Sequence, residues 1–380
     1  MSRPDSELST GRHLLWRFWQ TASGYWRGPA SWRAWLLCLL LVAIVICQLL
    51  TQYWLNFWNR DFFNALERKD SAALAATMLQ FFPLIGLSIA LAVWSVWGRM
   101  TAQRQWRRYV TIHLINAWLA QGHYRHLNDL NGDGAPRNSE YRIAEDARIA
   151  TDAPIDLLLS LFSSVLTAIT FFSVLASVGG TITVSLDGWT MVIPGYLVFG
   201  VILYSSLVTV SMLWLGRRMA SVVQEQVQAE AAFRAAANLI RETGEGILVV
   251  ESESQERKSL WVTMHNVITQ WRNLCWQIMR TTTITHGNIL LSPVVGLLLC
   301  APKYLAGAMT LGEVTQAAAA FVVVQSAFNW FVDNFQRMAD WRTAAGRVAV
   351  LLLALDELEH VDEAMSEAAA SAASPARASA

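Results

Sequence analysis

Residues 224–256, QEQVQAEAAFRAAANLIRETGEGILVVESESQE, form a polar segment between two apolar runs that are each long enough to cross a membrane. The segment is rich in alanine, which favours a helix, and Gly244 and Gly246 weaken that helix near its end. Residues three or four positions apart share one helix face. One such face carries Glu230, Arg234, Asn238, Arg241 and Glu245. Two interpretations follow: a polar stripe that lines a transport pathway, or a solvated helix held together by surface ion pairs.

The composition of the whole chain indicates a membrane protein. Of its 380 residues, 54% are hydrophobic and only 15% are charged, whereas soluble domains contain about 25% charged residues. The formal net charge is zero, so the composition does not favour nucleic acid as a partner. The four cysteines show no CxxC or Cys–His spacing, and we therefore expect no metal site, no disulfide and no cofactor.

Six apolar runs approach the roughly twenty residues that a helix needs to cross a bilayer. They lie at about 34–55, 79–97, 154–178, 189–215, 284–305 and 314–335. The stretch before them mixes Trp with Arg, which is typical of a helix at the lipid–water boundary. The stretch after them ends in a low-complexity Ala/Ser tail that we expect to be disordered. We therefore expect an interfacial segment at 1–33, a membrane domain at 34–360 and a disordered tail at 361–380.

The spacing of the apolar runs predicts the architecture. Two long polar stretches, 100–151 and 216–283, alternate with three short turns, and Lys and Arg concentrate in the long stretches and near both termini. This distribution predicts that the termini and the long stretches are cytoplasmic. Paired extensions of this length are typical of ABC exporters. We therefore predict an all-α membrane protein with six transmembrane helices, long cytoplasmic extensions and a type IV ABC exporter-like transmembrane domain.

Several catalytic motifs are missing from the sequence. It contains no Gly-x-x-x-x-Gly-Lys-Ser/Thr loop for nucleotide phosphates, no HExxH and no GxSxG. None of its lysines follows a glycine. We therefore expect a protein that is not an enzyme and that carries no ATP-hydrolysing site in these residues.

A series of short motifs resembles the SbmA/BacA-like branch of ABC-type membrane domains. In order, the motifs are NRDFFNAL at 59–66, YRIAED at 141–146, EAAFR at 230–234, RETGEGI at 241–247, TLGEVTQ at 310–316 and AFNWFVDNF at 327–335. The resemblance covers about 35–356. It implies a homodimeric importer of peptides in the bacterial cytoplasmic membrane, driven by protons.

Two departures from that branch keep an alternative open. The family often has an Asn-Pro-Asp-Gln-Arg-Ile-like run before its acidic pair, whereas this chain has NSEYRI at 138–143. The sequence around 230–245 is also closer to relatives that carry a fused ATPase. The alternative is a permease subunit whose nucleotide-binding subunit is a separate chain, and a non-transporting membrane scaffold is a third class.

Proton coupling requires carboxylates whose pKa is raised toward neutrality by burial or by a nearby negative charge. By the resemblance, glutamates in these positions form a proton-responsive ladder. The proton-coupling candidates are Glu230, Glu242, Glu245, Glu145 and Glu251, with Arg234, Arg241 and Asp146 as supporting residues. Asp152 and Asp156 stand at the mouth of the third predicted span. Arg234 and Arg241 would lower the pKa of neighbouring acids, which works against proton uptake at those positions.

Overall fold

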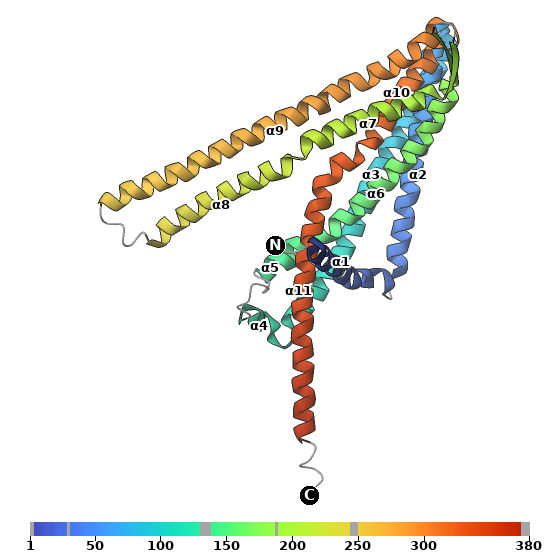
Figure 1. The fold of residues 1–380 in the computed structure, drawn as a ribbon. Coiled ribbons are helices and arrows are strands. Elements are labelled where there is room, and N and C mark those ends of the chain that lie inside the picture. The colour runs from blue at the N-terminus through green and yellow to red at the C-terminus, as the bar shows by residue number, and fades with distance from the viewer. Residues whose placement is uncertain (1–3, 29–30, 130–137, 187–188, 244–249, 374–380) are drawn as a thin grey trace. The chain divides into compact units, whose positions relative to one another are not determined.

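The computed structural model describes residues 4–28, 31–129, 138–186, 189–243 and 250–373. Almost all of them are helical (Figure 1). In chain order the elements are α1 (Pro4–Arg27), α2 (Ser31–Glu67), α3 (Ser71–Leu119), η1 (Ala120–Gly122), α4 (His123–Asp129), α5 (Ser139–Tyr141), η2 (Arg142–Asp146), α6 (Ala147–Gly179), β1 (Thr181–Leu186), β2 (Trp189–Pro194), α7 (Tyr196–Gly216), α8 (Met219–Thr243), α9 (Val250–Leu305), α10 (Leu311–Phe328) and α11 (Trp330–Ala373).

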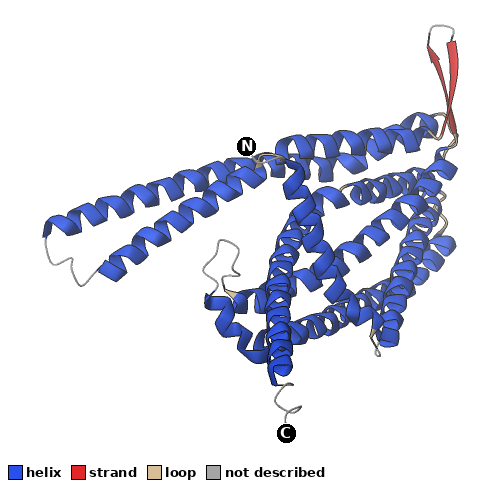
Figure 2. Ribbon diagram, turned by 60° about the horizontal axis from the view of Figure 1, so that its bottom comes forward, coloured by secondary structure: helices blue, strands red, loops and turns tan. Residues whose placement is uncertain are grey.

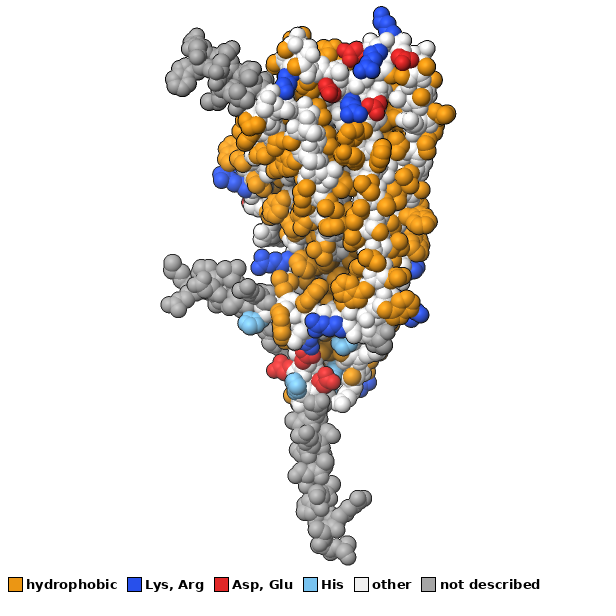
Figure 3. Space-filling view, turned by 90° about the vertical axis from the view of Figure 1, so that its right-hand side faces the viewer, with side chains coloured by type: hydrophobic (Ala, Val, Ile, Leu, Met, Phe, Trp, Pro, Cys, Tyr) orange, Lys and Arg blue, Asp and Glu red, His pale blue; other side chains and the backbone are white. Residues whose placement is uncertain are grey.

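Among the described residues, six helical segments are long and apolar enough to cross a membrane, as the sequence predicts. Their large apolar side chains are widely exposed, for example Leu203 at 75% and Leu290 at 71%. Hydrophobic side chains also cover most of the face shown in Figure 3, while charged side chains gather toward its ends. Apolar surface that is exposed to this extent is typical of helices that contact lipid rather than water. The fold is therefore that of a multi-pass membrane protein.

A β-hairpin corrects the predicted start of the fourth span. The apolar run predicts a span that begins at Trp189, but 189–194 is strand β2, which pairs antiparallel with β1 in a register that sets Thr181 opposite Pro194 (Figure 2). The helix α7 begins only at Tyr196. The sequence holds the signal, because Asp-Gly at 187–188 separates two runs of β-branched residues. Apolar character alone does not distinguish such a strand from the first turn of a span.

The chain divides into two compact units. The first comprises Met1–Trp58, Ala72–Thr167 and Asp333–Ala380, and the second comprises Asn59–Ser71 and Ala168–Val332. In the first unit, small residues of α6 and α11 are fully buried: Ala147, Ala150, Ala345 and Ala349. Small side chains allow two helix backbones to approach closely. This close approach places the charged side chains of α6 and α11 next to one another.

The N-terminal helix α1 packs on protein instead of presenting all of its apolar surface to lipid. Its Phe18 and Ala22 are buried in the core of the first unit. The Ala22 carbonyl accepts a hydrogen bond from Trp106 Nε1 at 3.0 Å, and Arg17 donates two hydrogen bonds of 2.7 Å to Asp356 of α11. Trp16 and Trp19, on the outer side of α1, remain exposed. The predicted interfacial contact is thus confined to that outer side and stays a prediction.

The C-terminal helix extends further than the sequence predicts. The composition predicts a disordered tail from 361, yet α11 continues to Ala373. Alanine has the highest helix propensity of all residues, so an Ala-rich tail that continues an existing helix does not pay the cost of nucleation.

In the second unit, the end of α2 caps the start of α10. Thr310 and Glu313 form a capping box at the N-terminus of α10. The side-chain oxygen of Asn64 accepts a hydrogen bond of 3.0 Å from the Gly312 backbone N–H. A Cβ atom at Gly312 would lie 2.1 Å from the Arg60 carbonyl oxygen, so only glycine fits there. The NRDFFNAL and TLGEVTQ motifs are therefore in direct contact.

Candidate functional site

The predicted polar stripe of Glu230, Arg234, Asn238 and Arg241 lies on α8, which runs beside α9 as an antiparallel hairpin (Figure 1). Glu230 is half-buried, and its Oε1 accepts a hydrogen bond from Trp271 Nε1 of α9 at 3.0 Å. Arg234 and Arg241 are exposed. The stripe is therefore split, with Glu230 facing the neighbouring helix and the two arginines facing away from protein.

Three further proton-coupling candidates of this segment are Glu242, Glu245 and Glu251. Glu242 lies in the last turn of α8 and Glu251 in the first turn of α9, where the structure describes the backbone. Glu245 lies outside the described residues. The ladder that the resemblance implies remains a prediction for these three positions.

Asp146 and its partner form the deepest charged contact of the first unit. Asp146 ends the π-helical turn η2 and is 0% exposed. Its two carboxylate oxygens accept hydrogen bonds from Arg347 of α11, 2.7 Å from Nε and 2.5 Å from the second terminal nitrogen. A buried carboxylate requires such a charge-assisted pair. This pair therefore fixes α11 against the start of α6.

Asp156 organises a second group of charges two residues into the apolar run of α6 that begins at Pro154. It accepts a 2.5 Å hydrogen bond from Arg337 of α11 and a 2.9 Å hydrogen bond from Gln103 of α3. Arg99 lies 3.4 Å away on α3. One carboxylate thus joins α3, α6 and α11 where the apolar spans begin.

Glu145 and Asp152 flank Arg148, and their pKa values are shifted in opposite directions. Arg148 lies 2.5 Å from Glu145 and 3.9 Å from Asp152. The hydrogen bond from Arg148 lowers the pKa of Glu145 below its usual value, and burial opposes this only in part. Burial raises the pKa of Asp152 above its usual 3.8, against the opposing charges of Arg107 and Arg148. Asp152 is therefore the better proton acceptor of the two.

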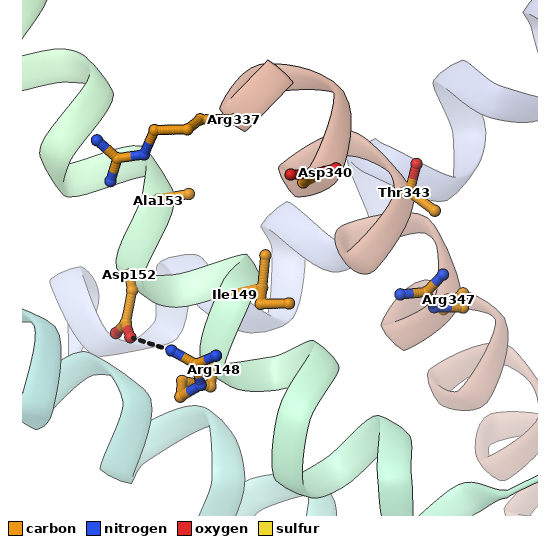
Figure 4. Close-up of a pocket in the computed structure, with 8 residues that line it drawn as sticks. All are labelled: Arg148, Ile149, Asp152, Ala153, Arg337, Asp340, Thr343 and Arg347. Carbon is orange, nitrogen blue, oxygen red and sulfur yellow. Dashed lines mark ion pairs between the residues drawn. The ribbon is translucent and has the colours of Figure 1, made fainter. Parts of the chain in front are cut away.

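Arg148 and Asp152 line a water-accessible pocket between α6 and α11, with a volume of about 380 Å³ (Figure 4). We call it the charged pocket. Its lining residues are Arg148, Ile149, Asp152, Ala153, Arg337, Asp340, Thr343 and Arg347. The three arginine side chains are 42%, 50% and 43% exposed, in the order Arg148, Arg337 and Arg347. The carboxylates that pair with these arginines are less exposed, at 37% for Glu145, 17% for Asp156 and 0% for Asp146, whereas Asp340 in the pocket lining is exposed.

The sequence indicates one wall of the charged pocket but not the other. Glu145, Asp146, Asp152 and Asp156 are candidates from the sequence, whereas no residue of 336–360, after the sixth span, is among them. Arg337, Asp340 and Arg347 recur there at spacings of three and seven, which places them on one face. That periodicity was the available signal. The pairing of this face with α6 could not be predicted, because the two segments lie about 200 positions apart.

Metal binding has no support among the residues whose side chains are described. No three His, Cys, Asp or Glu side chains come together there in a way that could hold an ion.

Comparisons with known proteins identify what this arrangement resembles. A family described as ABC transporter transmembrane region 2 matches residues 27–305, and this match confirms the resemblance to the SbmA/BacA-like class. The inner membrane ABC transporter ATP-binding protein YddA of Escherichia coli (strain K12) is 26% identical over 89% of this chain and 60% of its own length.

Two further relatives carry similar names. An uncharacterized ABC transporter ATP-binding protein of Synechocystis is 26% identical over 83% of this chain and 46% of its own length. ABC transporter D family member 2, chloroplastic, of Arabidopsis thaliana is 24% identical over 91% of this chain and 46% of its own length. The chain thus spans between about half and three-fifths of the relatives that it matches.

Proposed function

Because the chain belongs to the ABC transporter transmembrane region 2 family, we propose that it imports peptides across a bacterial cytoplasmic membrane as a homodimer driven by the proton gradient. Both termini and the polar ends of the helices lie on the cytoplasmic side in this proposal. The peptide cargo rests on the SbmA/BacA-like motifs. Proton coupling rests on one observation, which is the position of Asp152 in the charged pocket.

Asp152 combines the properties that a proton-coupling residue needs. It lines a water-accessible pocket, so protons can reach it. Its carboxylate lies 3.9 Å from Arg148, which is more closely paired with Glu145. Burial raises the pKa of Asp152, so the group takes up a proton more readily than an exposed aspartate does. Asp146, by contrast, is held by two short hydrogen bonds from Arg347.

Protonation of Asp152 alters the contacts of two neighbouring helices. The ionised carboxylate faces Arg107 of α3 and Arg148 of α6, and protonation removes that attraction. Both α3 and α6 continue from this point into apolar spans. A change in their packing at the pocket is thereby transmitted into the membrane. A membrane potential contributes about 2.3 kcal/mol per charge per 100 mV, which is enough to bias two states that differ by a few kcal/mol.

The surface of the α8–α9 hairpin supports a homodimer. In the polar half of α9, Trp261 and Val262 are 71% and 70% exposed. This half precedes the apolar run at 284–305, so lipid does not account for the exposure there. Large apolar side chains exposed outside a span mark a protein–protein contact. A second copy of the chain is the occupant that the family resemblance implies.

Uptake into proteoliposomes tests the proposal. Purified protein is reconstituted without nucleotide, a pH gradient is imposed, and entry of a fluorescent peptide is followed. The wild type is expected to accumulate peptide only with the gradient, and Asp152→Asn is expected to lose most of that dependence. Glu359→Gln is the control, because it neutralises an exposed acid elsewhere on α11. Equal uptake by wild type and Asp152→Asn would rule out Asp152 as the coupling group.

The names of the relatives favour a second candidate. Three of the four matched proteins are called ATP-binding proteins. In this candidate the chain is a permease subunit that works with an ATPase on a separate chain. Peptide uptake that requires ATP, stops with vanadate and accompanies a co-purifying ATPase subunit would favour it. Uptake driven by the pH gradient alone would exclude it.

A further inference from the structure

Buried polar side chains recur on three helices of the second unit, inside the apolar runs that form the spans. They are Ser205 of α7, Asn288 and Ser292 of α9, and Gln325 of α10, and each is between 0% and 7% exposed. We call these four residues the polar cluster. Bulk water does not reach a buried group at this depth, so a polar side chain there is costly unless it finds a partner.

Most of these side chains do not bond to their own helices. A serine hydroxyl in a helix can donate to a carbonyl three or four residues earlier, as Ser211 does in α7 and Ser326 does in α10. The hydroxyls of Ser205 and Ser292 and the amide nitrogen of Gln325 are buried, and they have no hydrogen-bond partner among the described residues. Their hydrogen-bonding capacity is therefore left for a further group.

The packing of α9 against α10 brings Ser292 and Gln325 to the same level. The two helices are joined by the short turn at 306–310 and pack as antiparallel neighbours. They approach closely at Gly296, where a Cβ atom would lie 3.3 Å from Phe321 Cβ. Ser292 lies one turn before Gly296, and Gln325 lies one turn after Phe321. Because the helices run in opposite directions, both steps lead to the same level of the interface.

Helix α7 reaches this level through Tyr204. Its ring lies 5.6 Å from the ring of Phe321, measured between centroids, and its hydroxyl donates a 3.0 Å hydrogen bond to Asn288 Oδ1. Ser205 follows Tyr204 directly in the sequence and is completely buried. Three helices thus carry hydroxyl and amide groups at one level of the spans, around the ring of Phe321.

The chemistry of the polar cluster selects a small neutral ligand. Hydroxyl and amide side chains both donate and accept hydrogen bonds, and none of the four residues is charged. The helices pack tightly beside the cluster, because a Cβ atom at Gly296 would lie 3.0 Å from Ala318 Cα. Water meets both conditions, since a buried water molecule typically makes about three hydrogen bonds to polar groups that lack a protein partner.

We propose that the polar cluster binds water inside the membrane, with hydrogen bonds to Ser205, Ser292 and Gln325. The bound water joins α7, α9 and α10 through contacts that these side chains do not make directly. A water molecule can exchange its hydrogen-bond partners, so the three spans can shift against one another without leaving a buried group unpaired. This site goes beyond the proposed transport function and depends on neither the cargo nor the energy source.

Radiolytic labelling tests the site. The full-length protein in detergent, with a radical scavenger in the bulk solution, receives a brief X-ray pulse that converts water into hydroxyl radicals where the water lies. Oxidised side chains are then identified by mass spectrometry. Phe321 is 0% exposed and is expected to be oxidised by water held in the cluster. Phe18, which is 2% exposed in the apolar core of the first unit, is the control and is expected to stay unmodified. Phe321 as unreactive as Phe18 would overturn the proposal.

Two variants assign the water to these side chains. Ser292→Ala and Gln325→Leu are each expected to reduce the oxidation of Phe321 severalfold. Ser326→Ala is the matched control on α10, because the exposed Ser326 already donates to the Val323 carbonyl. It is expected to leave the oxidation unchanged. Oxidation of Phe321 that is equal in wild type, Ser292→Ala and Gln325→Leu would overturn the assignment.

Thermal unfolding gives an independent reading of the same site. A dry, unpaired amide is costly, so its replacement by leucine would raise the melting temperature. If water satisfies the amide of Gln325, the variant Gln325→Leu instead deprives Ser292 of a shared partner. The melting temperature of Gln325→Leu is therefore expected to fall below that of the wild type, and a rise would contradict bound water.

Discussion

Asp146 and Arg347 are 201 positions apart in the sequence, yet they share two hydrogen bonds of 2.7 and 2.5 Å. Asp146 is completely buried, whereas Arg347 is 43% exposed and opens onto the charged pocket. The contact therefore has two roles. It joins the segment before the third span to the segment after the sixth, and it orients one of the guanidinium groups of the pocket.

This ion pair predicts an asymmetric effect on stability. Arg347→Met leaves the buried carboxylate of Asp146 unpaired, and the free energy of unfolding is expected to fall by about 3–5 kcal/mol. The double variant Asp146→Asn/Arg347→Met removes the isolated charge and is expected to recover part of that loss. Thermal unfolding of the purified protein measures both effects. A single variant as stable as the double variant would show that the pair carries no such penalty.

Asp152 predicts a change in the pH dependence of stability. Because its pKa is raised in the folded state, the folded protein binds more protons than the unfolded chain from pH 3.8 upward. The contribution of Asp152 to stability therefore falls as pH rises through that window. Asp152→Asn is expected to remove this fall and to be slightly more stable than wild type at neutral pH. The comparison is made by thermal unfolding across pH, with Glu359→Gln as the control.

Glu145 contributes in the opposite sense. Its pKa is lowered by Arg148, so its stabilising contribution is present above its ordinary value of 4.5 and disappears as pH falls through the lower, folded value. Glu145→Gln is expected to weaken the acid dependence of unfolding that Asp152→Asn leaves in place. Identical pH profiles for wild type and Glu145→Gln would contradict the assignment.

The close contact between α2 and α10 predicts that Gly312 does not tolerate a side chain. Gly312→Ala places a Cβ atom 2.1 Å from the Arg60 carbonyl oxygen and 2.5 Å from Asn64 Oδ1, and it is expected to destabilise by about 1–3 kcal/mol. Gly287→Ala in α9 is the matched control, because a Cβ atom there meets nothing within 4 Å. Equal thermal stability of Gly312→Ala and Gly287→Ala would show that the contact between α2 and α10 accommodates a Cβ atom with no loss of stability.

Glu230 of α8 accepts a hydrogen bond from Trp271 of α9. A variant that keeps this hydrogen bond but removes the charge therefore tests the role of the charge separately from the packing of the two helices. Glu230→Gln keeps an oxygen acceptor for Trp271 but removes the charge. If Glu230 couples protons to transport, this variant loses gradient-driven peptide uptake while its melting temperature stays near that of the wild type. Normal uptake by Glu230→Gln, Glu242→Gln and Glu245→Gln alike would contradict the ladder that the resemblance implies.

Much of the membrane architecture could be predicted from local sequence, because each span satisfies its backbone hydrogen bonds internally and needs only about twenty apolar residues. Apolar composition alone does not reveal the hairpin of β1 and β2. Strand β2, at 189–194, is apolar and leads into α7, so its composition resembles that of the start of a span. The resemblance motifs indicated the family, but not that Gly312 meets Asn64. That contact depends on the packing of α2 against α10, which no local pattern specifies.

The candidate site was only half predictable for a related reason. The resemblance motifs indicate Glu145 and Asp146, and the place of Asp152 and Asp156 at the mouth of the third predicted span indicates those two acids. Arg337 and Arg347 lie in a helix that is charged on several faces, where a functional face does not differ in composition from a solvated one. The structure distinguishes them, because the fold pairs Arg337 with Asp156 and Arg347 with Asp146.

Proton movement during transport tests the central claim most directly. Proteoliposomes that contain a pH-sensitive dye and an alkaline lumen, without nucleotide, receive peptide on the outside while internal pH is recorded. The account predicts that peptide evokes inward proton flow with the wild type and with Glu359→Gln, and that Asp152→Asn loses this flow. Peptide entry without any accompanying proton flow, or equal flow in Asp152→Asn, would contradict it.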